Sequence, residues 1–106
     1  MSKYLLTGTY AADGARGLMA EGGSKRRAAA TSAIESVGGS VESFYYAFGD
    51  TDVISIVDLP DDEAAAAVAL IANASGGATV KTTVLLTPEQ IDQAADRAVT
   101  YRPPGL

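Results

Sequence analysis

The chain has 106 residues, of which 47% are hydrophobic and 20% are charged, and its formal net charge is −5. This length and composition predict one globular domain, at residues 1–100, followed by a tail at residues 101–106. The negative charge argues against nucleic acid and anionic membranes as partners. The chain contains no cysteine and no histidine. That excludes disulfides, thiolate nucleophiles and the commonest transition-metal sites, so we expect no metal and no cofactor.

The chain also lacks the patterns that mark export or membrane insertion. No apolar stretch approaches 18 residues, and the first ten residues do not have the layout of a signal peptide. We therefore expect a cytoplasmic protein.

The first predicted element is a strand at residues 3–10, in which side chains alternate between two faces. Gly8 interrupts this strand and indicates either a bulge or the close approach of another backbone. Asp13 follows the strand and is the residue type that caps a helix. We expect the first helix to begin at Ala15 after this cap.

Residues 15–37 have a helical pattern that is interrupted by two adjacent glycines and a serine at residues 22–24. Glycine disfavours the interior of a helix, so the pattern predicts a short helix and then a second one, capped by Ser24 and ending at Val37. Lys25, Arg26 and Arg27 lie in the first turn of the second helix. Cations at this end oppose the helix dipole unless an anion or a carboxylate compensates for them.

Residues 41–60 predict a β-hairpin around a turn at Gly49, Asp50 and Thr51. Strict alternation puts Phe44 with Tyr46 on one face of the first arm, and Val41 with Tyr45 on the other. Apolar residues occur on both faces of both arms. The sheet that contains this hairpin is therefore expected to be covered on both sides.

A helix rich in alanine is predicted at residues 61–74, with three acidic residues at its start, where the helix dipole favours them. A fourth strand is predicted at residues 78–86, with Lys81 either on a solvated edge or in a polar cavity. Thr87, Pro88 and Gln90 then form a strong start signal for a short helix that reaches about Val99.

The order strand-helix-strand-strand-helix-strand predicts an α+β, ferredoxin-like sandwich with an antiparallel four-stranded sheet and a C-terminal helix. Both long helices then cover one face of the sheet, and the other face remains bare although it is apolar. A bare apolar face of this kind indicates a partner surface. We expect a second copy of the chain to cover it, in a homodimer or a higher homo-oligomer.

Short stretches spread from Tyr4 to about Ala98 carry a family pattern. They are Tyr10 with the turn after it, Gly22-Gly23-Ser24, Arg26-Arg27, Gly38-Gly39, residues 42–53 (ESFYYAFGDTDV), residues 59–61 (LPD), residues 73–76 (NASG), residues 81–83 (KTT) and residues 85–89 (LLTPE). In this order they resemble the GYD domain family. One departure is Thr51, because the family turn usually has tyrosine at this position.

The resemblance implies a ferredoxin-like fold of the dimeric α/β-barrel type, and it implies no settled activity. Dimeric barrels of this kind include small monooxygenases without cofactors and ligand-binding proteins, an analogy of fold and not of chemistry.

Four residues are candidates for a ligand site: Tyr10, Arg26, Arg27 and Tyr45. Arginine supplies charge and planar hydrogen bonding, and tyrosine supplies an aromatic face and a hydroxyl. This chemistry suits a small anionic or phenolic ligand. The alternatives are structural, because surface arginines form salt bridges, for example with Glu21, and tyrosines pack in cores and interfaces.

Asp50 and Asp52 have two interpretations. Two carboxylates two residues apart are consistent with a general base or a hard-metal site, but aspartate also stabilises turns through its own backbone. We expect the strand that Asp52 begins to run parallel to the first strand. This expectation places Asp52 and Tyr10 at opposite ends of the sheet.

Three functional hypotheses remain. The first is a homo-oligomeric small-ligand-binding or assembly protein. The alternative is a small-molecule enzyme without a cofactor, similar to a monooxygenase or an isomerase, in which Tyr10, Tyr45, Arg26 or Asp52 assists. The third is a purely structural subunit. The absence of histidine and cysteine disfavours the enzyme without excluding it, because a carboxylate can serve as the base.

Overall fold

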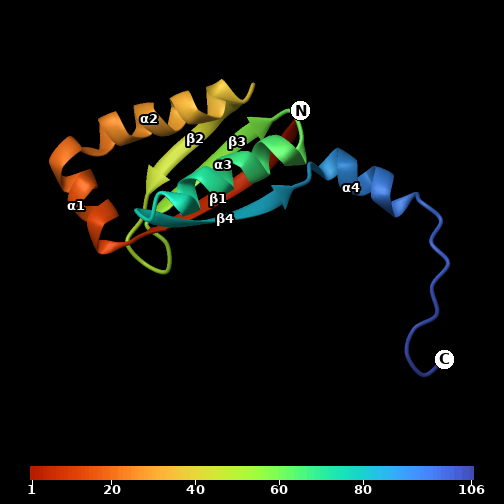
Figure 1. The fold of residues 1–106 in the computed structure, drawn as a ribbon. Helices are drawn as coiled ribbons and strands as arrows, with labels where there is room; N and C mark the ends of the chain where they lie inside the picture. Colours follow the sequence, from red (N-terminus) through yellow and green to blue (C-terminus); the bar gives the residue numbers. More distant parts are fainter.

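The protein is described by a computed structural model that covers all 106 residues. Four strands form one antiparallel sheet in the order β2-β3-β1-β4. The elements are β1 (Ser2–Tyr10), α1 (Ala12–Glu21), α2 (Gly23–Ser36), β2 (Ser40–Tyr46), β3 (Val53–Leu59), α3 (Asp62–Ala74), β4 (Ala78–Leu85) and α4 (Pro88–Ala95). This is the α+β arrangement expected from the sequence, and it is compatible with a ferredoxin-like fold (Figure 1).

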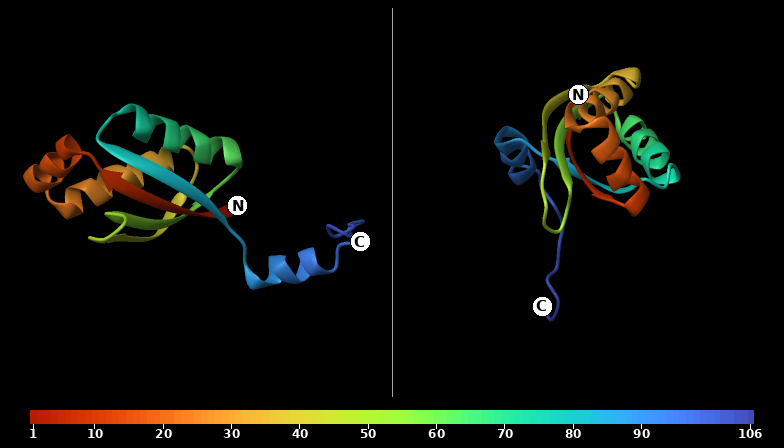
Figure 2. Two further views of the ribbon diagram at one scale, coloured as in Figure 1. Left: turned by 90° about the horizontal axis from the view of Figure 1, so that it is seen from below. Right: turned by 90° about the vertical axis from the view of Figure 1, so that its left-hand side faces the viewer.

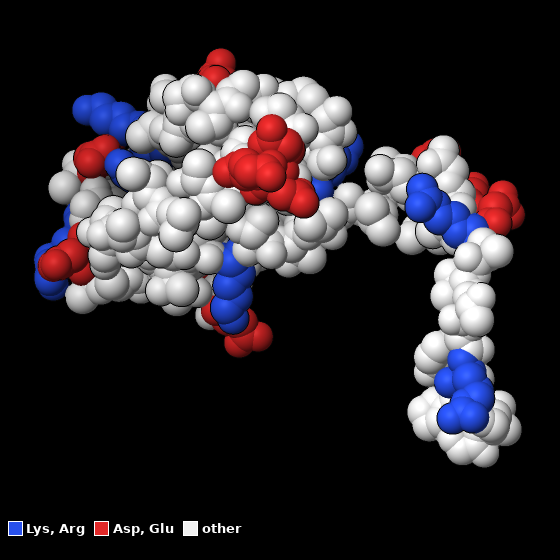
Figure 3. All heavy atoms as spheres, turned by 45° about the vertical axis from the view of Figure 1, so that its right-hand side comes forward, with Lys and Arg blue, Asp and Glu red and all other residues white.

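The helices are distributed unevenly around the sheet. The long helices α2 and α3 both lie on one face, and no helix covers the opposite face (Figure 2). The helix α4 and the residues after it stand clear of the domain (Figure 3). None of the helices has the length and apolar character needed to cross a membrane.

Of the two alternatives for Gly8, the bulge is not formed. Gly8 pairs regularly with Val53 on one side and with Val80 on the other. The irregularity lies instead in β2, where the register shifts between Val41 and Ser43. The extra residue reverses the alternation, so Val41 lies on the same face as Phe44, contrary to the strict alternation assumed from the sequence.

The predicted break in the 15–37 segment is confirmed, because α1 ends at Glu21 and α2 begins at Gly23. Gly22 between them has φ of 88°, a conformation that only glycine adopts without strain. The predicted caps are wrong. Neither helix has a side-chain cap, since the capping positions fall on Ala11 and Gly22, each two residues before the polar side chain expected to cap the helix.

The core occupies one end of the space between the sheet and the helices. Its buried members are Tyr4, Ile34, Val57, Leu59 and Ala65. The hydroxyl of Tyr4 donates to Asp62 Oδ1 over 2.6 Å, which fixes the start of α3 on β1. This hydrogen bond and the burial of the ring raise the pKa of Tyr4. Only seven residues in the chain are buried, so this end of the domain contains most of its close packing.

The start signal of the last helix is confirmed. Thr87 and Gln90 form a complete capping box, in which each side chain accepts from the other residue's backbone N–H, and Pro88 is the first residue of α4. The helix ends at Ala95, four residues before the expected Val99. No other element packs against α4, and short helices without packing are marginal in water, so a short helix is the expected consequence.

Candidate functional site

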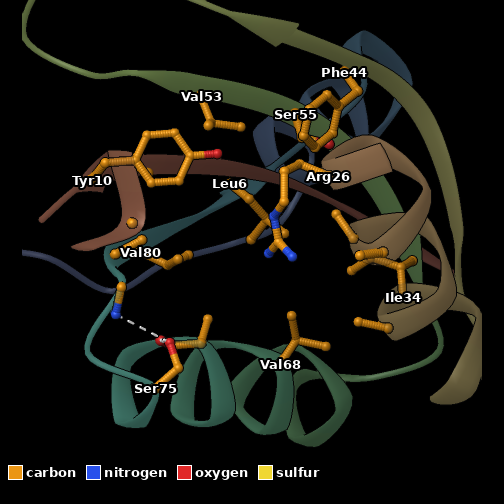
Figure 4. A pocket seen from close by; sticks show the side chains of 18 of the residues that line it. Leu6, Tyr10, Arg26, Ile34, Phe44, Val53, Ser55, Val68, Ser75 and Val80 are labelled. Carbon is orange, nitrogen blue, oxygen red and sulfur yellow. Dashed lines mark hydrogen bonds between the residues drawn. The ribbon is translucent and has the colours of Figure 1, made fainter. Parts of the chain in front are cut away.

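A cavity of about 520 Å³ lies between the sheet and the helix layer. It extends from the end of the sheet where β1 ends and β4 begins to the core, with which it shares Ile34 and Val57 (Figure 4). Of the 24 residues that line it, 15 are hydrophobic. A volume of this size matches the pockets that hold small organic molecules in proteins.

The cavity exists because the residues around it are small. Gly8 contributes no side chain from the centre of the sheet, and α2 presents Ala29, Ala30 and Ala33 where larger residues would meet the strands. Val53, on the strand next to Gly8, is also short. The interior therefore remains unfilled here, whereas the larger side chains of Tyr4 and Leu59 fill the core beyond it.

Two polar side chains enter this apolar space. Figure 4 shows the Tyr10 ring entering from the end of β1 with its hydroxyl directed inward, and the Arg26 guanidinium reaching in from the first turn of α2. The hydroxyls of Ser55 and Ser75 also belong to the lining, but each donates to a backbone carbonyl, at 2.9 Å and 2.6 Å. Tyr10 and Arg26 are therefore the groups available to orient a ligand.

Arg26 has one carboxylate beside it. Its Nη1 lies 3.7 Å from Glu21 Oε2, and the two side chains are 42% and 49% exposed. A pair this long and this exposed contributes at most about 1 kcal/mol. A ligand carboxylate can therefore replace Glu21 as the partner of Arg26 at little cost.

Tyr10 is a neutral hydrogen-bond donor at physiological pH. Burial raises the pKa of Tyr10, the neighbouring Tyr46 raises it further, and the Arg26 guanidinium acts in the opposite direction. The Tyr46 hydroxyl itself donates to the Gly23 carbonyl over 2.9 Å, which ties β2 to the start of α2. A phenol held in its neutral form can donate a hydrogen bond to an anion, but it cannot act as a phenolate base.

This pKa shift gives a spectroscopic prediction. Tyr10→Phe should remove one phenol that ionises above the ordinary tyrosine range, because the folded protein favours the neutral form. Neutral Tyr10 contributes to the stability of the folded state at every pH below the ordinary tyrosine pKa. This contribution is lost as the pH rises through the raised pKa of Tyr10. Absorbance at 295 nm during an alkaline titration of wild type and Tyr10→Phe measures the ionisation of each phenol. If the phenol missing from Tyr10→Phe were one that ionises within or below the ordinary tyrosine range, the raised pKa of Tyr10 would be contradicted.

The expected separation of Tyr10 and Asp52 is wrong. Since β3 runs antiparallel to β1, the residue before β3 lies beside the last residue of β1. The backbone N–H of Tyr10 donates to Asp52 Oδ2 over 2.8 Å, and the backbone N–H of Asp52 donates to the Gly8 carbonyl over 2.8 Å. The Asp52 carboxylate therefore holds the hairpin loop against β1, and its hydrogen bond goes to another strand and not to the backbone of its own turn.

The four candidate site residues do not form one group. Tyr10 and Arg26 line the large cavity. Arg27 and Tyr45 line a second depression of about 360 Å³ at the start of α2. Adjacent residues on a helix point about 100° apart, which separates the two arginines. Tyr45 is 70% exposed and lies on the sheet face opposite Tyr46.

No group of three or more acidic residues in the chain is arranged to hold a metal ion. Asp50 is exposed in the hairpin loop, and Lys81 is exposed on β4, which is an edge strand of the sheet. Neither residue lines the large cavity.

Sequence reasoning missed several residues of the site. The sequence indicates Glu21 only as a salt-bridge partner and does not mark Gly14 or Gly17 of α1, although all three line the cavity. The available signal was the clustering of small residues at matching positions: Gly8 in a strand, two glycines in α1 and the alanines of α2. Small residues on facing elements produce either close packing or a cavity, and the sequence does not distinguish these outcomes.

The comparisons with known proteins agree with the resemblance drawn from the sequence. The GYD domain model matches residues 4–95. No curated protein and no solved structure matches the chain. Since the matched segment contains the whole sheet except Ser2 and Lys3, the helices α1 to α3 and the helix α4, the chain belongs to the GYD domain family.

Proposed function

We propose that this GYD domain protein is a homo-oligomeric small-ligand-binding protein, and that the ligand occupies the cavity between the sheet and the helices α2 and α3. One observation carries the proposal: an apolar cavity of about 520 Å³ receives one cationic side chain, Arg26, and one neutral phenol, Tyr10. Apolar walls with a few directed polar groups are the usual composition of a small-molecule site.

The chemistry of the lining defines the ligand class. Arginine can bind a carboxylate through two parallel hydrogen bonds, or the single oxygen of a phenolate, and a neutral tyrosine can donate a further hydrogen bond to either. The remaining walls favour an apolar or aromatic body. A small aromatic carboxylate, or a phenol that ionises on binding, satisfies both requirements.

Binding is favoured over catalysis because no carboxylate is directed at the space that a ligand would occupy beside Tyr10 and Arg26. The carboxylates near Tyr10 and Arg26 are Asp52 and Glu21. The first accepts the backbone N–H of Tyr10, and the second is half exposed beside Arg26. General base catalysis requires a group that can reach a substrate proton. Glu21 is the one carboxylate in the lining, and an anionic ligand on Arg26 would displace it.

A calorimetric titration with benzoate and salicylate tests the proposal. Wild type should bind, and Arg26→Gln should bind at least tenfold more weakly, because a hydrogen bond to a charged group contributes about 1.5–3 kcal/mol and a tenfold change is about 1.4 kcal/mol.

The matched variant is Glu21→Gln, which removes the competing carboxylate and frees Arg26. It should bind the same anions more tightly than wild type. Equal affinities in all three proteins, or an absence of binding in all three, would remove this cavity as an anion site.

A further inference from the structure

The large cavity has its charged groups at one end only. Two charged side chains belong to its lining, Glu21 and Arg26, and their charged atoms lie 3.7 Å apart. Burial raises the pKa of Tyr10 and the Arg26 guanidinium opposes this shift, so the phenol lies within reach of the same charge. The groups that can recognise an anion are therefore gathered where β1 ends and α2 begins.

The part of the cavity next to the core carries no charge. Its apolar lining consists of residues that belong to the core or pack against it: Leu6, Ile34, Val41, Val57 and Val68. The hydroxyl in this part is that of Ser55, which is 5% exposed and donates to the Ser43 carbonyl over 2.9 Å. A polar ligand group would find no partner here and would lose its hydrogen bonds to water. This part of the cavity is therefore suited to an apolar group.

The elements that line the cavity give its length. Arg26 and Ile34 are eight residues apart on α2, which corresponds to about 12 Å along a helix. Tyr10 and Leu6 are four residues apart on β1, which corresponds to about 13 Å along a strand. Figure 4 shows Tyr10 and Ile34 on opposite sides of the open space. A helix and a strand therefore give similar values for the distance between the two ends.

The wall between the two ends is also apolar. The helix α2 contributes Ala29, Ala30 and Ala33, and α3 contributes Ile71, which is 70% exposed although it lines the cavity. A ligand that extends along this wall would remove apolar surface from water, which favours binding. A single aromatic ring bound at Arg26 is too short to reach the core end.

We infer that the ligand is an elongated carboxylate, with its carboxylate on Arg26 and Tyr10 and an apolar body about 12 Å long directed toward Ile34 and Val57. The inference rests on the proposed function and adds the length and the direction of the ligand. An extended carbon chain advances by about 1.2 Å per bond, so about eight to ten carbons span the cavity. Ala33, which lines the apolar part next to Ile34, then determines which chain lengths fit.

Calorimetric titrations with butanoate, hexanoate, octanoate and decanoate measure the length of the apolar part. In wild type the affinity should rise by about two- to fourfold for each added methylene up to octanoate, since full burial of a methylene corresponds to about fourfold. The increase should level off near decanoate, where the chain reaches the closed end at Ile34 and Val57. Octanoate should displace benzoate, because both carboxylates use Arg26.

A pair of variants on α2 locates the apolar body. Ala33→Leu fills the apolar part and leaves Arg26 and Tyr10 in place. The matched control is Ala28→Leu, because Ala28 is exposed on the same helix and does not line the cavity. Ala33→Leu should bind octanoate at least tenfold more weakly than wild type and should bind benzoate with the wild-type affinity. Ala28→Leu should bind both ligands as wild type does.

Three results would overturn the elongated ligand: an affinity that does not rise with chain length in wild type, octanoate that binds without displacing benzoate, or a folded Ala33→Leu that binds octanoate as tightly as Ala28→Leu. The first two need no variant, so they decide the matter even if Ala33→Leu does not fold. Benzoate binding that depends on Arg26 would leave the proposed function standing after any of these results. A wild type that binds none of these anions would overturn both.

Discussion

Gly14→Ala should lower the free energy of unfolding by about 3 kcal/mol, the upper range for overpacking. A Cβ atom at Gly14 would overlap the carbonyl oxygen of Gly77 and lie 2.9 Å from Cδ1 of Tyr10. The first of these neighbours is backbone and cannot rotate away. The same junction is fixed by a hydrogen bond of 2.9 Å from the Ala11 N–H to the Gly77 carbonyl. The start of α1 must therefore move if a methyl group is added.

The control is Gly17→Ala on the same helix. A Cβ atom at Gly17 meets nothing within 4 Å, and alanine is favoured over glycine in a helix by about 1 kcal/mol. This variant should be more stable than wild type by up to that amount. Urea denaturation monitored by circular dichroism measures both. If Gly14→Ala were as stable as Gly17→Ala, the close contact between α1 and the start of β4 would be incorrect.

The arrangement of elements was predictable because each signal in the sequence was local and strong. The glycine pair at residues 22–23 destabilises the interior of a helix, and it separates α1 from α2 as expected. Thr87, Pro88 and Gln90 set the start of α4. The order of strands and helices then left the antiparallel ferredoxin-like sheet as the expected arrangement.

The errors arose at the strand bulge and the helix starts, whose positions are set by backbone conformation and not by the type of side chain. A bulge requires one extra residue in a strand, and nothing in the residues around Glu42 marks it, whereas Gly8 suggested a bulge and forms none. Likewise, the caps at Ala11 and Gly22 use no polar side chain, so the expectation of polar caps placed the helix starts two to three residues too late.

The candidate site was predictable in part. Tyr10 and Arg26 were chosen for their chemistry, and both line the cavity. Arg27 and Tyr45 have the same chemistry but line a separate depression, because a helix and a strand direct neighbouring side chains to different sides. The cavity itself depends on the spacing between the sheet and the layer of helices that covers it. No single residue carries that information, and the small residues that create it have no chemistry to recognise.

The most direct test of the ligand cavity is a change that fills it without altering its polar groups. Gly8 lies at its centre in a regular strand, and a Cβ atom there would meet Val53 Cβ at 3.7 Å and the Thr79 carbonyl oxygen at 3.9 Å, which are ordinary contacts. Gly8→Phe should therefore fold and place its ring in the ligand space. Gly8→Ala is the control, since it adds one methyl group and leaves most of the volume open.

The measurement is an NMR titration of wild type, Gly8→Ala and Gly8→Phe with benzoate. Wild type and Gly8→Ala should show saturable shifts of backbone amides in the residues that line the cavity, Tyr10 and Arg26 among them. Gly8→Phe should remain folded and show affinity at least tenfold lower, a loss of about 1.4 kcal/mol or more. A folded Gly8→Phe that binds benzoate as wild type does, or a wild type that gives no saturable shifts, would contradict the assignment of this cavity as the ligand site.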